Sequence, residues 1–226
     1  MRAIASEVSL DRQGFALLRH ETGMGDFWDD EEVREVYYPE VEAAIAAATG
    51  ADRIFIFDHT QRRRVPGADD RMPGAPRQPA TRVHVDHTEK SGPQRVRDLL
   101  GAEAEELLRG RVQVINLWRP IRGPLYDAPL ALCDAGSVAP SDLVPADLVY
   151  RNRTGETYAV THNPDHRWFY VPAMGRDEAL LIKCYDSRTD GRARFAPHTS
   201  FIDPTASANA PPRESIEIRS LVFHRA

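Results

Sequence analysis

The chain has 226 residues, which is long enough for one large domain or two small ones with a sizeable core. Its formal charge of −5 argues against a general nucleic-acid binder, because such proteins usually carry a strongly basic surface. No stretch approaches the roughly 20 apolar residues that span a bilayer, so we expect no membrane association. The two cysteines, Cys133 and Cys184, lack a CxxC spacing. They are expected to be small apolar core residues, and a reducing cytoplasm is the expected location.

Two stretches have the pattern of helices. Residues 29–51 place acids early and apolar residues at helical spacing, and Pro39 is expected to divide the helix. Residues 91–110 predict the clearest helix, with Ser91 as its N-terminal cap. Its predicted apolar side consists of Val96, Leu99, Leu100, Leu107 and Leu108.

The remaining regular structure is predicted to be strand. Short β-branched or aromatic runs, separated by Gly and Pro, occupy residues 52–60, 81–88, 111–118, 157–163, 167–173, 179–186, 193–201 and 214–223. This pattern predicts a mainly β protein with flanking helices (α+β), built as an antiparallel barrel or two-sheet roll. We expect one domain over residues 1–226, with a largely helical or irregular packing segment at 1–50. Residues 69–79 form a polar loop that is either a surface connection or a mobile lid.

A candidate metal site lies in the run RVHVDHT. Residues two apart in a strand share a face, so His84 and Asp86 point the same way while His87 points away. Two imidazoles and one carboxylate on one side of the ion are the ligands of non-haem iron(II) oxygenases. The second imidazole must come from far along the chain, and His198 in a late strand is the best candidate. A polar patch in a strand is the alternative, because His-x-Asp alone is a weak signal.

A second polar pair follows fifteen residues after His198. Arg213 and Ser215 share a strand face and offer a guanidinium fork and a hydroxyl to one carboxylate. The far carboxylate of 2-oxoglutarate fits this pair, whereas a surface salt bridge is the simpler account of a single arginine. Ile216 and Ile218 would then face the other side of the wall.

The chain also resembles a known family from about residue 25 to its end. The resemblance is carried by the motifs FDHTQRRR, RVHVDHT, INLWRPIRGPLYDAPLALCD, HNPDHRWFYVPAM, DEALLIKCYDS, FAPHTSF and APPRESIEIR. The family is that of iron(II)/2-oxoglutarate oxygenases that includes fungal gibberellin desaturase-like enzymes and the hydroxylase component of cephamycin methoxylation. The resemblance implies a double-stranded β-helix (jelly-roll, cupin-like) core. It also implies His84, Asp86 and His198 as ligands of Fe(II), Arg213 as the 2-oxoglutarate anchor, and O2 as the oxidant.

Several other residues are weaker candidates. Asn116 is either a second 2-oxoglutarate anchor, as in related oxygenases, or an ordinary buried amide. His162 and His166 have a ligand-like spacing, but the intervening Asn-Pro-Asp predicts a capped loop. Possible substrate contacts are Arg119, Lys183 and Tyr185, and a buried lysine would need a carboxylate partner. The run Arg62–Arg64 is expected to be a solvated edge, although it could bind one anionic small molecule.

The sequence therefore predicts an Fe(II)- and 2-oxoglutarate-dependent dioxygenase. It would hydroxylate or desaturate a small natural-product or amino-acid-like substrate and release succinate and CO2. Two alternatives stay open: a cupin-like hydrolase or isomerase that uses another divalent metal, and a non-catalytic barrel that binds a small acid.

Overall fold

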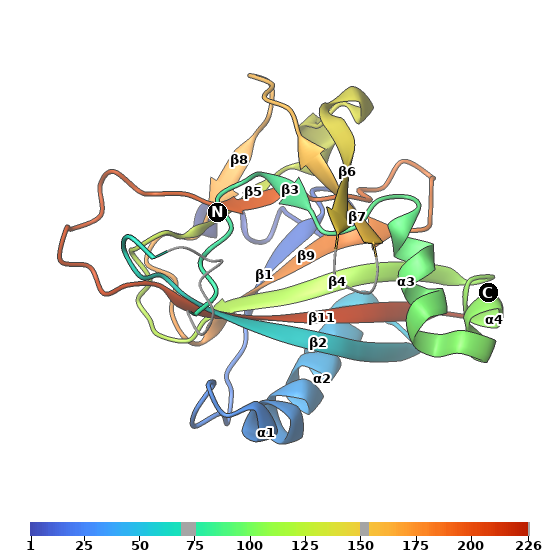
Figure 1. Ribbon diagram of the computed structural model, residues 1–226, viewed down its shortest axis with the longest axis horizontal. Coiled ribbons are helices and arrows are strands. Elements are labelled where there is room, and N and C mark those ends of the chain that lie inside the picture. The colour runs from blue at the N-terminus through green and yellow to red at the C-terminus, as the bar shows by residue number, and fades with distance from the viewer. Residues whose placement is uncertain (69–75, 150–153, 226) are drawn as a thin grey trace.

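Two antiparallel sheets form the framework of the computed structural model, which describes residues 1–68, 76–149 and 154–225 (Figure 1). The five-stranded sheet contains, in spatial order, β1 (Phe15–Arg19), β9 (Glu178–Asp186), β4 (Arg111–Pro120), β11 (Glu214–His224) and β2 (Arg53–Arg63). The six-stranded sheet contains, in spatial order, β6 (Leu143–Val149), β7 (Thr154–Val160), β3 (His84–Val85), β10 (His198–Ser200), β5 (Leu130–Cys133) and β8 (Trp168–Tyr170). The expected mainly β roll with flanking helices is thus observed.

Strand alternation gives the five-stranded sheet two apolar faces. Its inner face packs against the six-stranded sheet, with Trp118 of β4 and Leu132 of β5 in one buried cluster. On the outer face, Ile216 and Ile218 of β11 belong to a second buried cluster that includes Ile45 of the N-terminal helix. The isoleucines therefore face away from the space between the sheets, as the sequence predicts, and polar residues of β11 can point into it.

The N-terminal helix covers the outer face of the five-stranded sheet (Figure 1). It runs through α1 (Asp30–Glu32), a π-helical turn (Val33–Tyr37) and α2 (Tyr38–Thr49) without a break, so the predicted division at Pro39 is wrong. The amide of Tyr38 donates to the carbonyl of Val33, five residues earlier. This wider turn precedes Pro39, whose missing amide is tolerated in the first turn of α2.

The second predicted helix is broken. α3 (Ser91–Leu100) is followed by a 3-10 turn (Gly101–Glu103) and then by α4 (Ala104–Leu107). Gly101 has φ 52° and ψ −116°, a conformation outside the helical range that glycine tolerates best. The expected cap is also different, because the hydroxyl of Thr88 accepts from the amide of Ser91 at 3.0 Å. Further 3-10 turns span Arg2–Ile4, Ala135–Ser137 and Pro140–Asp142.

All eight predicted strands are present, but sequence patterns did not reveal β1, β5 and β6. β1 (FALLR) and β5 (LALC) are short and contain Leu and Ala in place of β-branched residues. β6 contains Pro145, which fits its position at the edge of the six-stranded sheet. Most of the predicted polar loop, 69–75, lies outside the described residues; residues 76–79 form neither helix nor strand.

Candidate metal centre

Three potential metal ligands meet in the space between the two sheets. β3 pairs with β10 so that His84 lies directly opposite His198, and the two ring centroids are 4.5 Å apart. One ligand atom each from His84, Asp86 and His198 lie within 4.8 Å of one another. We call these three residues the His-Asp-His cluster. Sequence alternation placed the first two on one face, and the strand pairing supplies the third.

Hydrogen bonds to the other ring nitrogens orient both imidazoles. Nδ1 of His84 donates to the carbonyl of Arg82 at 2.8 Å, and Nδ1 of His198 donates to the carbonyl of Ala196 at 3.1 Å. Each Nε2 therefore faces the carboxylate of Asp86, at 3.4 Å from His84 and 3.9 Å from His198. Such backbone contacts fix the tautomer and the ring orientation of a histidine that binds a metal.

The electrostatics of the cluster suit a cation. Burial and the nearby charge of His84 lower the pKa of His198 to about 4, so this imidazole is neutral at pH 7. Burial alone would raise the pKa of Asp86, but the hydrogen bond with His84 and the charges of both histidines hold it well below its usual range. An ionised carboxylate beside a neutral imidazole is a ready donor set for a divalent metal.

Asn116 contacts the cluster through Asp86. It lies on β4, and its Nδ2 donates to Oδ2 of Asp86 at 2.7 Å. Its Oδ1 is buried and has no hydrogen-bond partner among the described residues. A carbonyl oxygen cannot donate to a carboxylate, so this placement favours an Asn116 that orients Asp86 over one that anchors 2-oxoglutarate.

A small cavity of about 20 Å³ lies between the two histidines of the cluster and Arg213. Its lining includes His84, His198, Trp118 and Arg213. Nε of Arg213 donates to Oγ of Ser215 at 3.1 Å, Nη1 donates to the carbonyl of Ala128 at 2.9 Å, and the guanidinium lies 4.9 Å from the Trp118 ring centroid. The predicted Arg-x-Ser pair is thus formed at the side of this cavity.

Arg213 is a buried cation that lacks a carboxylate partner for its guanidinium among the described residues. Burial and the nearby charge of Arg62 lower its pKa to about 9. By contrast, Arg219, on the same strand face, is held by two hydrogen bonds to Asp58, at 2.6 and 3.0 Å. An anion is therefore the missing partner of Arg213 and not of Arg219.

Two further residues belong to the cavity: sequence reasoning missed Glu217, and it included Arg62 only in a run that was either a solvated edge or a site for one anionic small molecule. Arg62 and Glu217 both line it, so the expectation of a solvated edge is wrong for Arg62. It holds for the exposed Arg63, whose Nε lies 2.8 Å from Glu214, while Arg64 pairs with Asp127 at 2.8 Å. The available signal for Glu217 was its alternation with Arg213 and Ser215 along β11.

The three possible substrate contacts have structural roles instead. Arg119 is buried on the outer side of β4, where Nη2 donates to the carbonyl of His20 at 3.1 Å. Lys183 is buried with Asp11 and Asp186 at 2.7 and 2.8 Å, which supplies the carboxylate partner that the sequence requires. Tyr185 lies in the core between the sheets. A register shift where β9 pairs with β4, between Val114 and Ile115, breaks the simple alternation that grouped Lys183 with Tyr185.

The remaining histidines and cysteines are placed as expected. His87 is outside the cluster; its Nδ1 lies 3.3 Å from Oγ of Ser91. His166 pairs with Asp142 at 3.0 Å, and Asn163 accepts from the amide of Asp165, which forms the predicted turn. Cys133 and Cys184 are buried and not disulfide-bonded.

A larger cavity of about 410 Å³, which we call the mouth, opens on the other side of Asp86. Helix α3 and the β6–β7 hairpin line it together with β2 and β11. Its lining contains charged groups of both signs, among them Asp58, Arg95, Glu156 and Arg219. A molecule bound in the mouth would lie next to the cluster, on the side away from Arg213.

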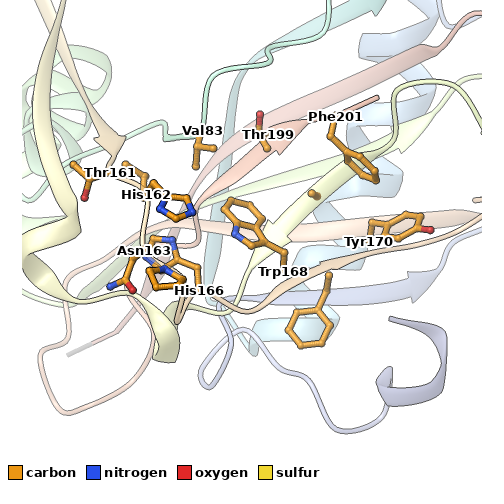
Figure 2. Close-up of a pocket in the computed structure, with 13 residues that line it drawn as sticks. Val83, Thr161, His162, Asn163, His166, Trp168, Tyr170, Thr199 and Phe201 are labelled. Atoms are coloured by element: carbon orange, nitrogen blue, oxygen red, sulfur yellow. The ribbon is translucent and has the colours of Figure 1, made fainter. Parts of the chain in front are cut away.

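A third cavity, of about 580 Å³, is separated from the cluster by the six-stranded sheet. Figure 2 shows His162 and His166 at one end, Trp168 in the middle, and Tyr170 and Phe201 at the other end. Val83 and Thr199 line it; Val83 directly precedes His84 and Thr199 directly follows His198 in the sequence. Thr199 also lines the small cavity beside Arg213, but none of the three cluster residues lines this apolar cavity, so it is not the metal centre.

Comparison with known proteins agrees with this geometry. The family model described as "Oxidoreductase/YMDC permease-like domain" matches residues 1–223. Hydroxylase/desaturase efuI of Hormonema carpetanum is 37% identical, with 99% of this chain and 81% of the relative covered. The alpha-ketoglutarate-dependent dioxygenase phiK of a fungal species is 36% identical, with coverages of 96% and 79%. None of the described helices is long and apolar enough to cross a membrane.

The fold leads to the same family. The solved structure of the iron and alpha-ketoglutarate-dependent endoperoxidase NvfI superposes with a TM-score of 0.89 at 29% identity. The match covers 100% of this chain and 83% of NvfI. The two-sheet roll is accordingly the jelly-roll core of these enzymes. On these grounds the chain belongs to the Fe(II)/2-oxoglutarate-dependent oxygenase family, and it is an enzyme that uses Fe(II), 2-oxoglutarate and O2 on small-molecule substrates.

Proposed function

We propose that His84, Asp86 and His198 hold the Fe(II), that Arg213 and Ser215 hold the far carboxylate of 2-oxoglutarate, and that the substrate enters through the mouth. The observation that carries the proposal is one cavity that lies between the two histidines of the His-Asp-His cluster and a buried arginine without a carboxylate partner among the described residues. This arrangement also disfavours a simple hydrolase, in which Arg213 would have no keto-acid to bind.

The donor set fits iron(II). His84, Asp86 and His198 would supply two imidazoles and one carboxylate to the ion, the donor set typical of non-haem iron(II) oxygenases. Bound Fe(II), with 2-oxoglutarate and O2, supplies the oxidising chemistry in which the cosubstrate is converted to succinate and CO2. The protein orients the donors: Asn116 fixes Asp86, and backbone carbonyls fix both imidazoles.

Arg213 and Ser215 position the cosubstrate. The guanidinium is already held by Ser215 and the carbonyl of Ala128, so little rotamer entropy remains to be lost on binding. The ring of Trp118 forms an apolar wall beside it and excludes water from the ion pair. These contacts pre-organise the cavity for one carboxylate at a fixed distance from the cluster.

The mouth favours a polar small molecule. Its charged groups are partly paired with one another, as in Arg219 with Asp58, so a substrate must offer hydrogen-bonding groups to replace lost water contacts. A natural-product or amino-acid-like substrate fits this requirement, and its hydroxylation or desaturation is the proposed outcome. We further propose one domain over residues 1–226 and a cytoplasmic location.

The proposal is tested by adding Fe(II) and 2-oxoglutarate to the protein without oxygen. A weak visible charge-transfer band should appear only when both are present, and no substrate is required. The His198→Ala variant is the matched control and should show no band at the same concentrations. A wild-type protein that binds Fe(II) but never develops the band would contradict the proposal.

A further inference from the structure

The pairing of β2 with β11 turns one arginine of the Arg62–Arg64 run toward the cosubstrate cavity. Arg62 lies opposite Ser215 in this antiparallel pair, and directly paired residues point to the same face. The neighbours point to the other face: Gln61 donates to Asp30 at 2.9 Å, and the guanidinium of Arg63 stacks 4.4 Å from the Trp28 ring centroid.

The side chain of Arg62 is held in place at the cavity. Its Nη1 donates to the carbonyl of Gln78 at 2.7 Å. Arg62 lines the same cavity as His198 and Arg213, and its charge lowers the pKa of Arg213. Two cations that repel each other across a buried cavity are stabilised together by an anion placed between them.

The charges of the cavity call for this second cation. Glu217 also lines it, and burial together with the charge of Asp86 raises the pKa of Glu217. Iron(II) and Asp86 leave one positive charge, which the keto-acid carboxylate can neutralise, and Arg213 can neutralise the far carboxylate. The charges of Arg219, Arg62 and His84 favour an ionised Glu217, and Arg62 is the arginine of this group that lines the cavity. Removing Arg62 would leave the negative charge of Glu217 less fully offset where the cosubstrate binds.

We infer that Arg62 is a second cationic residue of the 2-oxoglutarate site, which interacts with a carboxylate of the cosubstrate held by Arg213 and offsets the charge of Glu217. The inference rests on the proposed function. It assigns a positioning role to one arginine of a run for which the sequence left two readings open, a solvated strand edge or a site for one anionic small molecule.

The test compares Arg62→Gln and Arg62→Lys with Arg63→Gln as the matched control. Each protein is loaded with Fe(II) without oxygen and titrated with 2-oxoglutarate, with the charge-transfer band as the readout of binding. Arg62→Gln should weaken 2-oxoglutarate binding by roughly tenfold to a hundredfold, the loss of one charge-assisted contact. Arg62→Lys should recover most of the affinity, and Arg63→Gln should stay within about twofold of wild type.

Fe(II) affinity and the thermal midpoint are measured on the same proteins. Both should be nearly unchanged in Arg62→Gln, because Arg62 is neither a member of the His-Asp-His cluster nor one of the buried core residues. Wild-type 2-oxoglutarate affinity in Arg62→Gln would overturn the inference. Equal losses in the Gln and Lys variants, with a lowered thermal midpoint, would also overturn it and assign Arg62 to anchoring the chain at Gln78. If the wild-type protein itself fails to bind 2-oxoglutarate, the proposed function fails instead.

Discussion

Replacing Arg213 by glutamine tests the cosubstrate site at its most defined point. Arg213 is only 2% exposed, and its guanidinium is fixed by Ser215 at 3.1 Å and the carbonyl of Ala128 at 2.9 Å. Glutamine keeps a polar side chain, but it is shorter and lacks the charge and the planar fork. The variant should therefore fold and bind Fe(II), yet hold 2-oxoglutarate poorly.

The magnitude follows from the contact that is lost. A hydrogen bond to a charged group contributes about 1.5–3 kcal/mol, and a buried bidentate contact lies in the upper part of that range. About 2–3 kcal/mol corresponds to a 30- to 150-fold loss of affinity. Only the affinity for 2-oxoglutarate should fall, because Arg213 is proposed to bind the far carboxylate and is not a metal ligand.

The assay is a 2-oxoglutarate titration of the Fe(II) protein without oxygen, followed by the charge-transfer band. Arg219→Gln is the matched control, since this arginine shares the strand face of Arg213 but is already paired with Asp58. It should shift the titration by less than about threefold. An unchanged titration for Arg213→Gln with a large shift for Arg219→Gln would refute the assignment of the anchor.

Three further predictions concern the metal and the fold. Alanine at any member of the His-Asp-His cluster should abolish tight Fe(II) binding and 2-oxoglutarate turnover with retention of the fold, whereas His87→Ala should bind Fe(II) normally in the same titration. Asn116→Ala removes the 2.7 Å hydrogen bond to Asp86 and should weaken Fe(II) binding by about 10- to 100-fold; unchanged Fe(II) affinity would show that Asp86 needs no such support. Asp186→Asn removes a buried carboxylate that both Lys183 and Arg111 contact and leaves the two cations to share Asp11. It should lower the free energy of unfolding by about 3–5 kcal/mol in urea denaturation, and a loss below about 1 kcal/mol would contradict this role.

The local sequence determined most of the strands and two residue pairs of the site. A period of two placed His84 with Asp86 and Arg213 with Ser215, because neighbouring residues on a strand have only two faces to choose from. The same rule sent Ile216 and Ile218 to the opposite wall, where they pack beneath the N-terminal helix. The family motifs then implied His198 as the third ligand, which no local pattern could select.

Only the tertiary structure decided which faces meet. The pairing of β3 with β10 brings His198 opposite His84, and the pairing of β2 with β11 turns Arg62 into the cavity. A shift of one residue in either register would move the side chain to the other face of its sheet. Register is set by contacts between strands that are far apart in the chain, and the shift between β4 and β9 that separates Lys183 from Tyr185 arises in the same way. Local alternation divides the side chains of each strand into two sets, and the long-range pairing decides which set faces the cavity.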